Sequence, residues 1–264
     1  MKIRDYFTKY DKDTTRIVLS YMLDKSYSEV VYNQDFDVES DLAEKIDEVF
    51  VKIEQGYPIQ YALKRWNFYG RDFQVDEDVL IPRRETELLV ELVLKEGIVD
   101  RKVLDIGTGS GAIAITLKLE EPDAVVSASD ISQKAIKKAI SNAELMGANV
   151  DFIESDLFEN IKGKFDYIVS NPPYISQKDY DNLENLLYFE PKNALLGGEL
   201  GYEIYEKIIE QAKDFLNLDG KIFFEIGFDQ AEIVSNLLEE SGFSNIKVHR
   251  DYGGYDRIVE GTNK

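Results

Sequence analysis

The residues Val103-Leu104-Asp105-Ile106-Gly107-Thr108-Gly109-Ser110-Gly111-Ala112 decide the fold class of this chain. A short apolar run, typical of a buried strand, passes here into a loop with three glycines, and a helix-like segment follows from about Ala112. Glycine permits a tight turn and lets a ligand approach the backbone closely. The helix would point its free N–H groups at whatever binds there. This stretch therefore predicts a strand–loop–helix unit with a ligand at the loop.

Strand-like and helix-like segments alternate after this loop, with one amphipathic helix expected between Ser132 and Gly147. Such alternation predicts right-handed crossovers and an α/β fold, a doubly wound, mostly parallel sheet of seven strands. Few residues around Gly253-Gly254 separate the last two strands, which should pair as a terminal antiparallel hairpin. The expected strands are Lys102–Asp105, Ala124–Ser129, Val150–Glu154, Phe165–Ser170, Lys221–Ile226, Ile246–Arg250 and Arg257–Glu260.

The first 75 residues have a different pattern, with apolar residues three and four positions apart, which predicts helices over about 14–23 and 42–53. We expect a small helical domain over 1–75 that recognises the substrate, and a ligand-binding domain over 76–264. An aromatic stretch over about 66–82 would link them, with a hairpin turn at Tyr69-Gly70. Such aromatic clusters pack between structural parts more often than they stack on a substrate.

The chain has 264 residues and a formal net charge of −20, with 51 acidic against 31 basic residues. Because phosphates are bound mainly by Lys and Arg, such a chain is a poor general binder of duplex DNA or of an anionic membrane. It has no cysteine, which excludes disulfides and thiolate metal sites, and we expect no metal. The N-terminus lacks the apolar stretch of a signal peptide and no run reaches transmembrane length, so we expect a cytoplasmic protein.

The glycine loop admits more than one interpretation. Gly107-x-Gly109-x-x-Ala112, with Asp130 at the end of the second strand, satisfies a loose dinucleotide fingerprint, and the simplest alternative is a turn without a ligand. Three details favour S-adenosylmethionine over NAD. Asp105 can meet an ammonium group, the loop is compact enough for an amino-acid tail, and Asp156 can accept a hydrogen bond from an adenine amino group while Leu157 packs on the ring. Alone, Asp156 would more often be a solvated turn residue.

A second motif, Ser170-Asn171-Pro172-Pro173-Tyr174-Ile175, stands where the fourth strand of the predicted sheet ends. Proline has no N–H and fixes φ, so the pair of prolines stops the strand and makes a stiff turn. Such a turn can hold Asn171 and Tyr174 in fixed directions. Taken alone, it is more often only a strand terminator.

Together, Asp105-x-Gly107-x-Gly109-x-Gly111, Asp130 and Asn171-Pro172-Pro173-Tyr174 resemble the class I S-adenosylmethionine-dependent methyltransferases, which have a Rossmann-like fold. Further stretches resemble one branch, the peptide-chain-release-factor glutamine-N5 methyltransferases, and the resemblance covers essentially the full length. These stretches are Leu80-Ile81-Pro82-Arg83-Arg84-Glu85-Thr86-Glu87, Phe189-Glu190-Pro191 with Ala194-Leu195, Glu225-Ile226-Gly227 with Gln230, and Asp251 with Asp256-Arg257.

The resemblance implies a cofactor, a substrate and their sites. S-adenosylmethionine would lie with its methionine part on Gly107, Thr108, Gly109, Ser110 and Gly111 and its ribose on Asp130. The substrate would be the glutamine of the Gly-Gly-Gln loop of class I release factors. The residues Asn171, Pro172, Pro173 and Tyr174 would hold this glutamine, with Asn171 also beside the cofactor.

An amide nitrogen is a poor nucleophile because its lone pair is delocalised into the carbonyl group. The side-chain oxygen of Asn171 and the main-chain carbonyl of Pro172 can each accept one hydrogen of the target NH₂, which aims the lone pair at the methyl group. Tyr174 can pack on the flat amide. The alternative is an amino-methyltransferase of DNA or RNA, in which Tyr174 would stack on a flipped base. That enzyme should carry a basic groove or a separate recognition domain, and neither is evident in the sequence.

Overall fold

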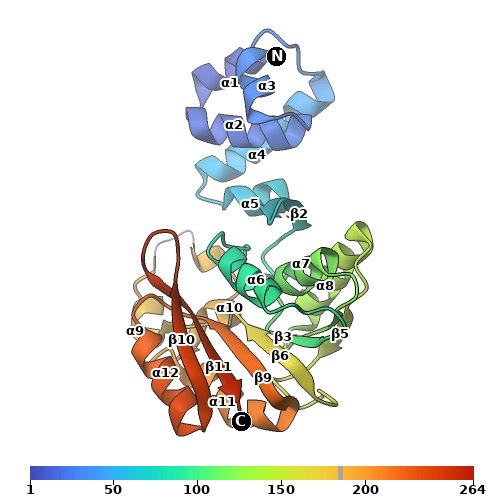
Figure 1. Ribbon diagram of the computed structural model, residues 1–264. Helices are drawn as coiled ribbons and strands as arrows, with labels where there is room; N and C mark the ends of the chain where they lie inside the picture. The colour runs from blue at the N-terminus through green and yellow to red at the C-terminus, as the bar shows by residue number, and fades with distance from the viewer. Residues whose placement is uncertain (184–186) are drawn as a thin grey trace. The chain divides into compact units, whose positions relative to one another are not determined.

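Residues 1–183 and 187–264 are described by the computed structural model, and their contacts divide the chain into two units, Met1–Arg65 and Trp66–Lys264 (Figure 1). One hydrophobic core draws only on residues between Ile3 and Leu63, and the other cores only on residues from Phe68 onward. The sequence places the domain boundary near residue 75, whereas the two units meet between Arg65 and Trp66.

The first unit is helical, as the sequence predicts. Asp11 caps the second helix by accepting from the N–H groups of Asp13 and Thr14, and Ser26 caps the third. Tyr10 stacks on Phe50 in the core, with ring centroids 3.8 Å apart. The helices are α1 (Ile3–Lys9), α2 (Lys12–Leu23), α3 (Tyr27–Tyr32), α4 (Ser40–Glu54) and α5 (Ile59–Leu63).

The expected turn at Tyr69-Gly70 is confirmed. It joins β1 (Arg65–Phe68) to β2 (Arg71–Gln74) in a two-stranded sheet. Both turn residues have positive φ, 51° and 74°, the conformation that a two-residue hairpin turn requires at both central positions.

The second unit is built on the seven-stranded sheet that the sequence predicts. Its order is β10-β11-β9-β6-β3-β4-β5. The pairs within β9-β6-β3-β4-β5 are parallel, whereas β11 is antiparallel to both β9 and β10, so the terminal hairpin is confirmed. The strands are β3 (Lys102–Ile106), β4 (Val125–Asp130), β5 (Asp151–Glu154), β6 (Phe165–Ser170), β9 (Leu216–Glu225), β10 (Phe243–Arg250) and β11 (Asp256–Asn263).

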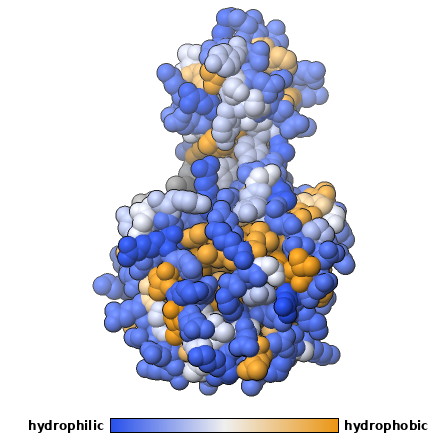
Figure 2. Space-filling model, in the orientation of Figure 1, coloured by the Kyte–Doolittle hydropathy of each residue, from blue (hydrophilic) through white to orange (hydrophobic). Residues whose placement is uncertain are grey.

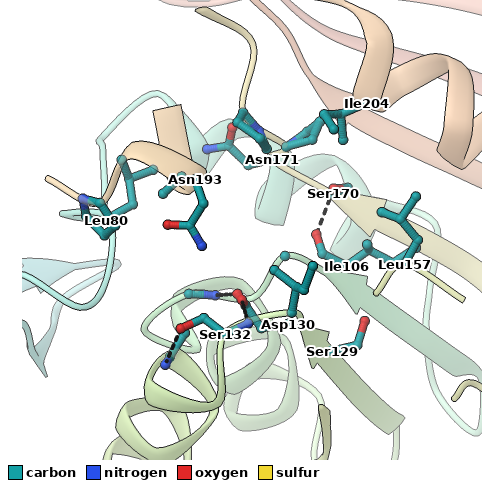
Figure 3. A pocket seen from close by; sticks show the side chains of 18 of the residues that line it. Leu80, Ile106, Ser129, Asp130, Ser132, Leu157, Ser170, Asn171, Asn193 and Ile204 are labelled. Carbon is teal, nitrogen blue, oxygen red and sulfur yellow. Dashed lines mark hydrogen bonds between the residues drawn. The ribbon is translucent and has the colours of Figure 1, made fainter. Parts of the chain in front are cut away.

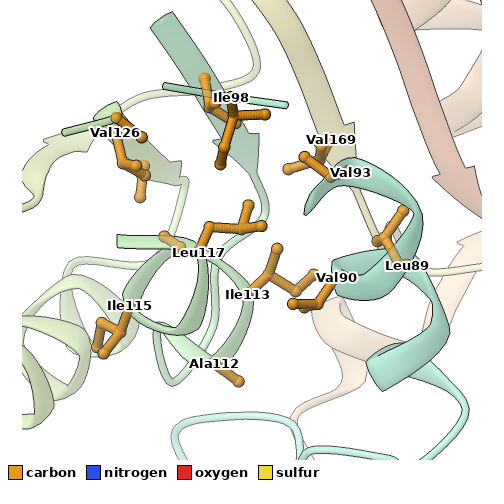
Figure 4. Packing of buried hydrophobic residues seen from close by; sticks show 14 of the residues in the cluster. Leu89, Val90, Val93, Ile98, Ala112, Ile113, Ile115, Leu117, Val126 and Val169 are labelled. Carbon is orange, nitrogen blue, oxygen red and sulfur yellow. The ribbon is translucent and has the colours of Figure 1, made fainter. Parts of the chain in front are cut away.

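Helices cover both faces of this sheet because neighbouring residues of its central strands point to opposite faces. Val103, Val169 and Phe223 pack in one core with α6 (Thr86–Lys95) and α7 (Ala112–Glu120), as Figure 4 shows for part of this cluster. A neighbouring residue of each strand, Leu104, Ile168 and Phe224, packs in the other core, with α11 (Glu203–Phe215) and α12 (Ala231–Glu240). The helix α8 (Gln133–Met146) lies with the first group. The sheet is therefore doubly wound.

The strand order reverses between β3 and β6, and the carboxyl ends of these strands therefore meet at a crevice. Short elements follow β6 at this edge, and β7 pairs with β8. They are β7 (Ile175–Ser176), α9 (Gln177–Tyr180), a 3₁₀ turn (Leu187–Phe189), α10 (Lys192–Leu195) and β8 (Leu196–Gly198).

The surface of the second unit is largely hydrophilic on the face that Figure 2 displays, with hydrophobic residues gathered in a band near its centre. None of the helices in the described part of the chain is long and apolar enough to cross a membrane.

Candidate active site

A cavity of about 290 Å³ opens at the carboxyl ends of β3, β4 and β6. Figure 3 shows Asp130 and Ser132 on one side of it, Asn171 and Leu80 on the other, and Asn193 pointing between them. We call this the first cavity. Its wall contains eight residues that the sequence predicts for the site: Gly107, Gly109, Asp130, Asp156, Leu157, Asn171, Pro172 and Pro173.

The three glycines of the loop divide into two roles. Gly107 and Gly109 have φ of 75° and 56°, and a Cβ on either would meet no atom within 4 Å, so their backbone is open to a ligand. A Cβ on Gly111 would instead lie 2.6 Å from Ile115 Cδ1 and 3.1 Å from Ala139 Cβ. Gly111 therefore serves the close packing of α7 on α8. Like Thr108 and Ser110, it is absent from the wall of the first cavity.

Asp130 ends β4 with its carboxylate held by two backbone groups. Its Oδ2 accepts from Gly109 N at 2.9 Å and its Oδ1 from Ser132 N at 2.8 Å. Burial raises the pKa of this carboxyl above its usual value, and these two hydrogen bonds oppose that shift. Each oxygen keeps lone pairs for another donor, so Asp130 can accept from two neighbouring hydroxyl groups such as those of a ribose.

Asp105 lies beneath the loop and not in the cavity wall. It is fully buried, and its Oδ2 accepts from Thr108 Oγ1 at 2.6 Å. Burial raises the pKa of Asp105 to about 7. The structure thus places Asp105 and Thr108 as a pair that supports the glycine loop, and direct contact of Asp105 with an ammonium group stays a prediction.

Asp156 and Leu157 follow β5 and form another wall of the first cavity. Leu157 has a φ of 45°, in the left-handed region that is unfavourable for a residue with a branched side chain. Its carbonyl accepts from Ser155 Oγ at 3.0 Å, and Ser155 Oγ also accepts from Asn160 N at 3.0 Å. These bonds hold the strained turn, which presents Leu157 as an apolar surface beside the acid.

A second cavity, of about 290 Å³, adjoins the first and shares with it Leu80, Asn171 and Ala194. Tyr174, which the sequence predicts for substrate binding, lines only this second cavity. Asn171 therefore faces two compartments, one beside the glycine loop and one beside Tyr174. The other residues of the second wall are Arg83, Ile175, Leu187, Leu195 and Glu225.

Residues far apart in the sequence brace the loop after β6 and the wall opposite it. Glu190, 4% exposed, accepts from Ile81 N at 3.1 Å and pairs with Arg83. Gln230 Nε2 donates to the carbonyls of Tyr174 and Gly201, both at 3.1 Å. Through these contacts, stretches that resemble the family and lie far apart in the sequence come together around the second cavity.

Sequence reasoning missed several residues of the site, among them Asn193 and Asp78 in the wall of the first cavity. It also missed Thr86, whose Oγ1 accepts from Asn171 Nδ2 at 3.3 Å. Thr86 lies inside the stretch from Leu80 to Glu87, so the only signal for it was the resemblance of that stretch.

The first cavity fits S-adenosylmethionine in its donors, acceptors and apolar surface. Asp130 offers acceptors for ribose hydroxyls, Leu157 an apolar wall for a flat base, and Gly109 an open backbone for an amino-acid tail. Its volume lies near the lower end of the range for ligand pockets.

Comparison with known proteins agrees with this geometry. Residues 84–200 match the family model described as "Methyltransferase small domain". A release factor glutamine methyltransferase of Streptococcus pneumoniae is 37% identical over an alignment of 272 positions that covers 98% of each chain. Another, of Lactococcus lactis subsp. lactis, is 43% identical over 217 residues, 81% of this chain and 80% of that one. A solved methyltransferase structure from Pyrococcus furiosus shares the fold, with a TM-score of 0.58 at 20% identity, over 85% of this chain and 99% of that one.

Proposed function

This chain belongs to the family of release factor glutamine methyltransferases, and from this premise we propose that it methylates the side-chain nitrogen of the Gly-Gly-Gln glutamine in class I peptide chain release factors. S-adenosylmethionine is the methyl donor. The observation that carries the proposal is the position of Asn171 in the walls of both cavities, where it can touch the methyl donor and the target amide together.

The chain's own residues bind and aim the target. The Asn171 side-chain oxygen and the Pro172 carbonyl each accept one hydrogen of the target NH₂, so the nitrogen lone pair points toward the first cavity. Tyr174 packs against the flat amide in the second cavity, where burial raises the pKa of its hydroxyl to about 12 and so keeps it neutral even in alkaline solution. S-adenosylmethionine supplies an electrophilic methyl group on a sulfonium. Positioning is therefore the protein's main contribution.

Asp130 and the open backbone of Gly107 and Gly109 hold the cofactor in this proposal, with Asp156 and Leu157 at the adenine. Asp105, Thr108, Ser110 and Gly111 support the loop from below. The reaction takes place in the cytoplasm, where release factors act in translation.

The direct test offers labelled S-adenosylmethionine together with an unmethylated class I release factor, and DNA in a parallel reaction. We expect label in the release factor and none in a variant factor whose Gly-Gly-Gln glutamine is changed to glutamate. Label that enters only DNA would replace this function by the nucleic-acid alternative, which the net charge of −20 disfavours.

The first unit, in our proposal, recognises the body of the release factor. All residues of both cavities lie in the second unit, from Asp78 onward, and each unit has its own core. A fragment Trp66–Lys264 should therefore bind S-adenosylhomocysteine as the full chain does, yet methylate intact release factor far more slowly. Circular dichroism checks its folding. If a folded fragment worked at the full-length rate, recognition would not lie in the first unit.

A further inference from the structure

Glu225 is a buried carboxyl group that the proposed methyl transfer does not use. It ends β9, is 1% exposed, and lines the second cavity with Asn171 and Tyr174. Thr86, the first residue of α6, lies close enough for its hydroxyl to lower the pKa of Glu225, and Thr86 Oγ1 accepts from Asn171 Nδ2 at 3.3 Å. Side chains from β9, from α6 and from the loop after β6 thus lie in a row that ends at Asn171.

The donors and acceptors in this chain determine its direction. A hydroxyl group has one hydrogen and two lone pairs, and an ionised carboxylate can only accept. An ionised Glu225 can only take the hydrogen of Thr86, which leaves the lone pairs of Thr86 for Asn171. The NH₂ end of the Asn171 amide therefore turns to Thr86, and a reversed amide would bring two oxygens together with no hydrogen between them.

We propose that Glu225 and Thr86 are positioning residues that hold the Asn171 amide with its oxygen toward the target nitrogen. The inference rests on the proposed function, because a target NH₂ requires an acceptor at this position. With the amide reversed, hydrogens of Asn171 would face hydrogens of the target and the two groups would repel each other. Asn171 can then be correctly placed by its backbone and still be catalytically incompetent.

The charge of Glu225 depends on its surroundings. Burial raises its pKa to about 7, while the Thr86 hydrogen bond and the nearby arginines lower it. Once protonated, Glu225 can donate to Thr86 and release the Thr86 hydrogen for either orientation of Asn171. The charged and titratable groups that face it are Arg257 on β11, Arg83 and Glu85 before α6, Tyr174 after β6 and Tyr205 on α11.

The test compares Thr86→Val, which keeps the shape and removes the hydroxyl, with Thr86→Ser, which keeps the hydroxyl. Thr116→Val is the matched control, since Thr116 is buried and its hydroxyl has no hydrogen-bond partner among the described residues. Single-turnover methylation of an unmethylated release factor is measured at saturating factor and S-adenosylmethionine. Thr86→Val should be slower by on the order of tenfold to a hundredfold, with unchanged affinity for S-adenosylhomocysteine. Thr86→Ser should recover most of the rate.

A pH profile adds a readout that a merely structural role would not change. The parent rate should fall below about pH 7 as Glu225 takes up its proton. Glu225→Gln keeps an acceptor oxygen for Thr86 but cannot titrate. Its methylation rate should therefore not fall below about pH 7. The inference would be overturned if Thr86→Val methylated the release factor at the parent rate. It would also be overturned if the rate of Glu225→Gln still fell below about pH 7 as that of the parent does. A parent enzyme that does not methylate the release factor would instead refute the proposed function.

Discussion

The proposed active site has a cofactor side around the first cavity and a target side around the second, and the two are assembled over very different distances along the chain. On the cofactor side, Gly109 bonds to Asp130, 21 residues away, within one strand–helix–strand unit. On the target side, Asn171 reaches Thr86 across 85 residues, and Ile81 reaches Glu190 across 109. A local motif can therefore specify the cofactor side, whereas the target side exists only when the whole second unit has folded.

Asn171→Ala gives the largest effect that we expect, because Asn171 lies where the two sides meet. Loss of one preorganised acceptor should lower the single-turnover rate by on the order of 10²–10³, with release-factor affinity near normal. Circular dichroism should report an intact fold, since Pro172 and Pro173 set the turn. If Asn171→Ala bound the cofactor much more weakly but kept the parent single-turnover rate, Asn171 would serve mainly the cofactor side.

Asp130→Ala probes the cofactor side alone. A charge-assisted hydrogen bond contributes about 1.5–3 kcal/mol, so the dissociation constant for S-adenosylhomocysteine should rise by roughly tenfold to a hundredfold. Calorimetric titration measures this, with Asp151→Ala as the control because Asp151 is an exposed acid on β5. An unchanged constant for Asp130→Ala would mean that the ribose acceptor is misassigned.

Gln230→Leu probes the long-range bracing of the target side. It leaves the Tyr174 and Gly201 carbonyls without their donor, which should lower the free energy of unfolding by about 1–3 kcal/mol. We expect a methylation rate roughly tenfold lower and an unchanged affinity for S-adenosylhomocysteine. Gln211→Leu is the control, since Gln211 Nε2 donates to the Lys207 carbonyl within the same helix. If Gln230→Leu lowered the affinity for S-adenosylhomocysteine as much as it lowered the methylation rate, the two sides of the site would not be independent.

The smallest expected effect is a dependence of stability on pH, caused by one buried acid on each side of the site: Asp105 on the cofactor side and Glu225 on the target side. Burial raises the pKa of both Asp105 and Glu225 to about 7, from usual values of 3.8 and 4.5. Between these values and pH 7 the folded state holds protons that the unfolded chain has released, so the free energy of unfolding should fall as pH rises through this range. Thermal melts should give a lower Tm at pH 7.5 than at pH 5.5. Asp105→Asn and Glu225→Gln should each remove part of this slope, and a Tm that rises with pH would contradict the assignment.

The sequence predicts the large sheet and the glycine loop well because both have local patterns. The apolar runs locate each strand of the large sheet, and the glycine spacing locates a loop whose Gly107 and Gly109 have positive φ. The same pattern could not separate these two glycines from Gly111, since only the packing of α7 on α8 distinguishes them.

The sequence predicts the target side only in part, because contacts between residues far apart in the chain leave no local pattern. Pro172 and Pro173 predict a rigid turn at Asn171. The partner of the Asn171 side-chain NH₂ group, however, is set by how α6 packs beside β6 and β9. Neither Thr86 nor Gln230 lies in a pattern that identifies its contact, because a hydrogen bond across 85 or 56 residues has no local signature. Asn193, on a helix of four residues, has none either.

The connection between β6 and α11 carries most of the walls that distinguish the second cavity, and this has an evolutionary consequence. Exchanging Ile175 or Leu187, which line only the second cavity, would change what enters it and leave the wall of the first cavity as it is, so a new substrate could be acquired without rebuilding the cofactor site. Gly197 limits that freedom. A Cβ there would lie 2.5 Å from the Pro173 carbonyl oxygen, so any side chain at this position would displace the turn that holds Asn171.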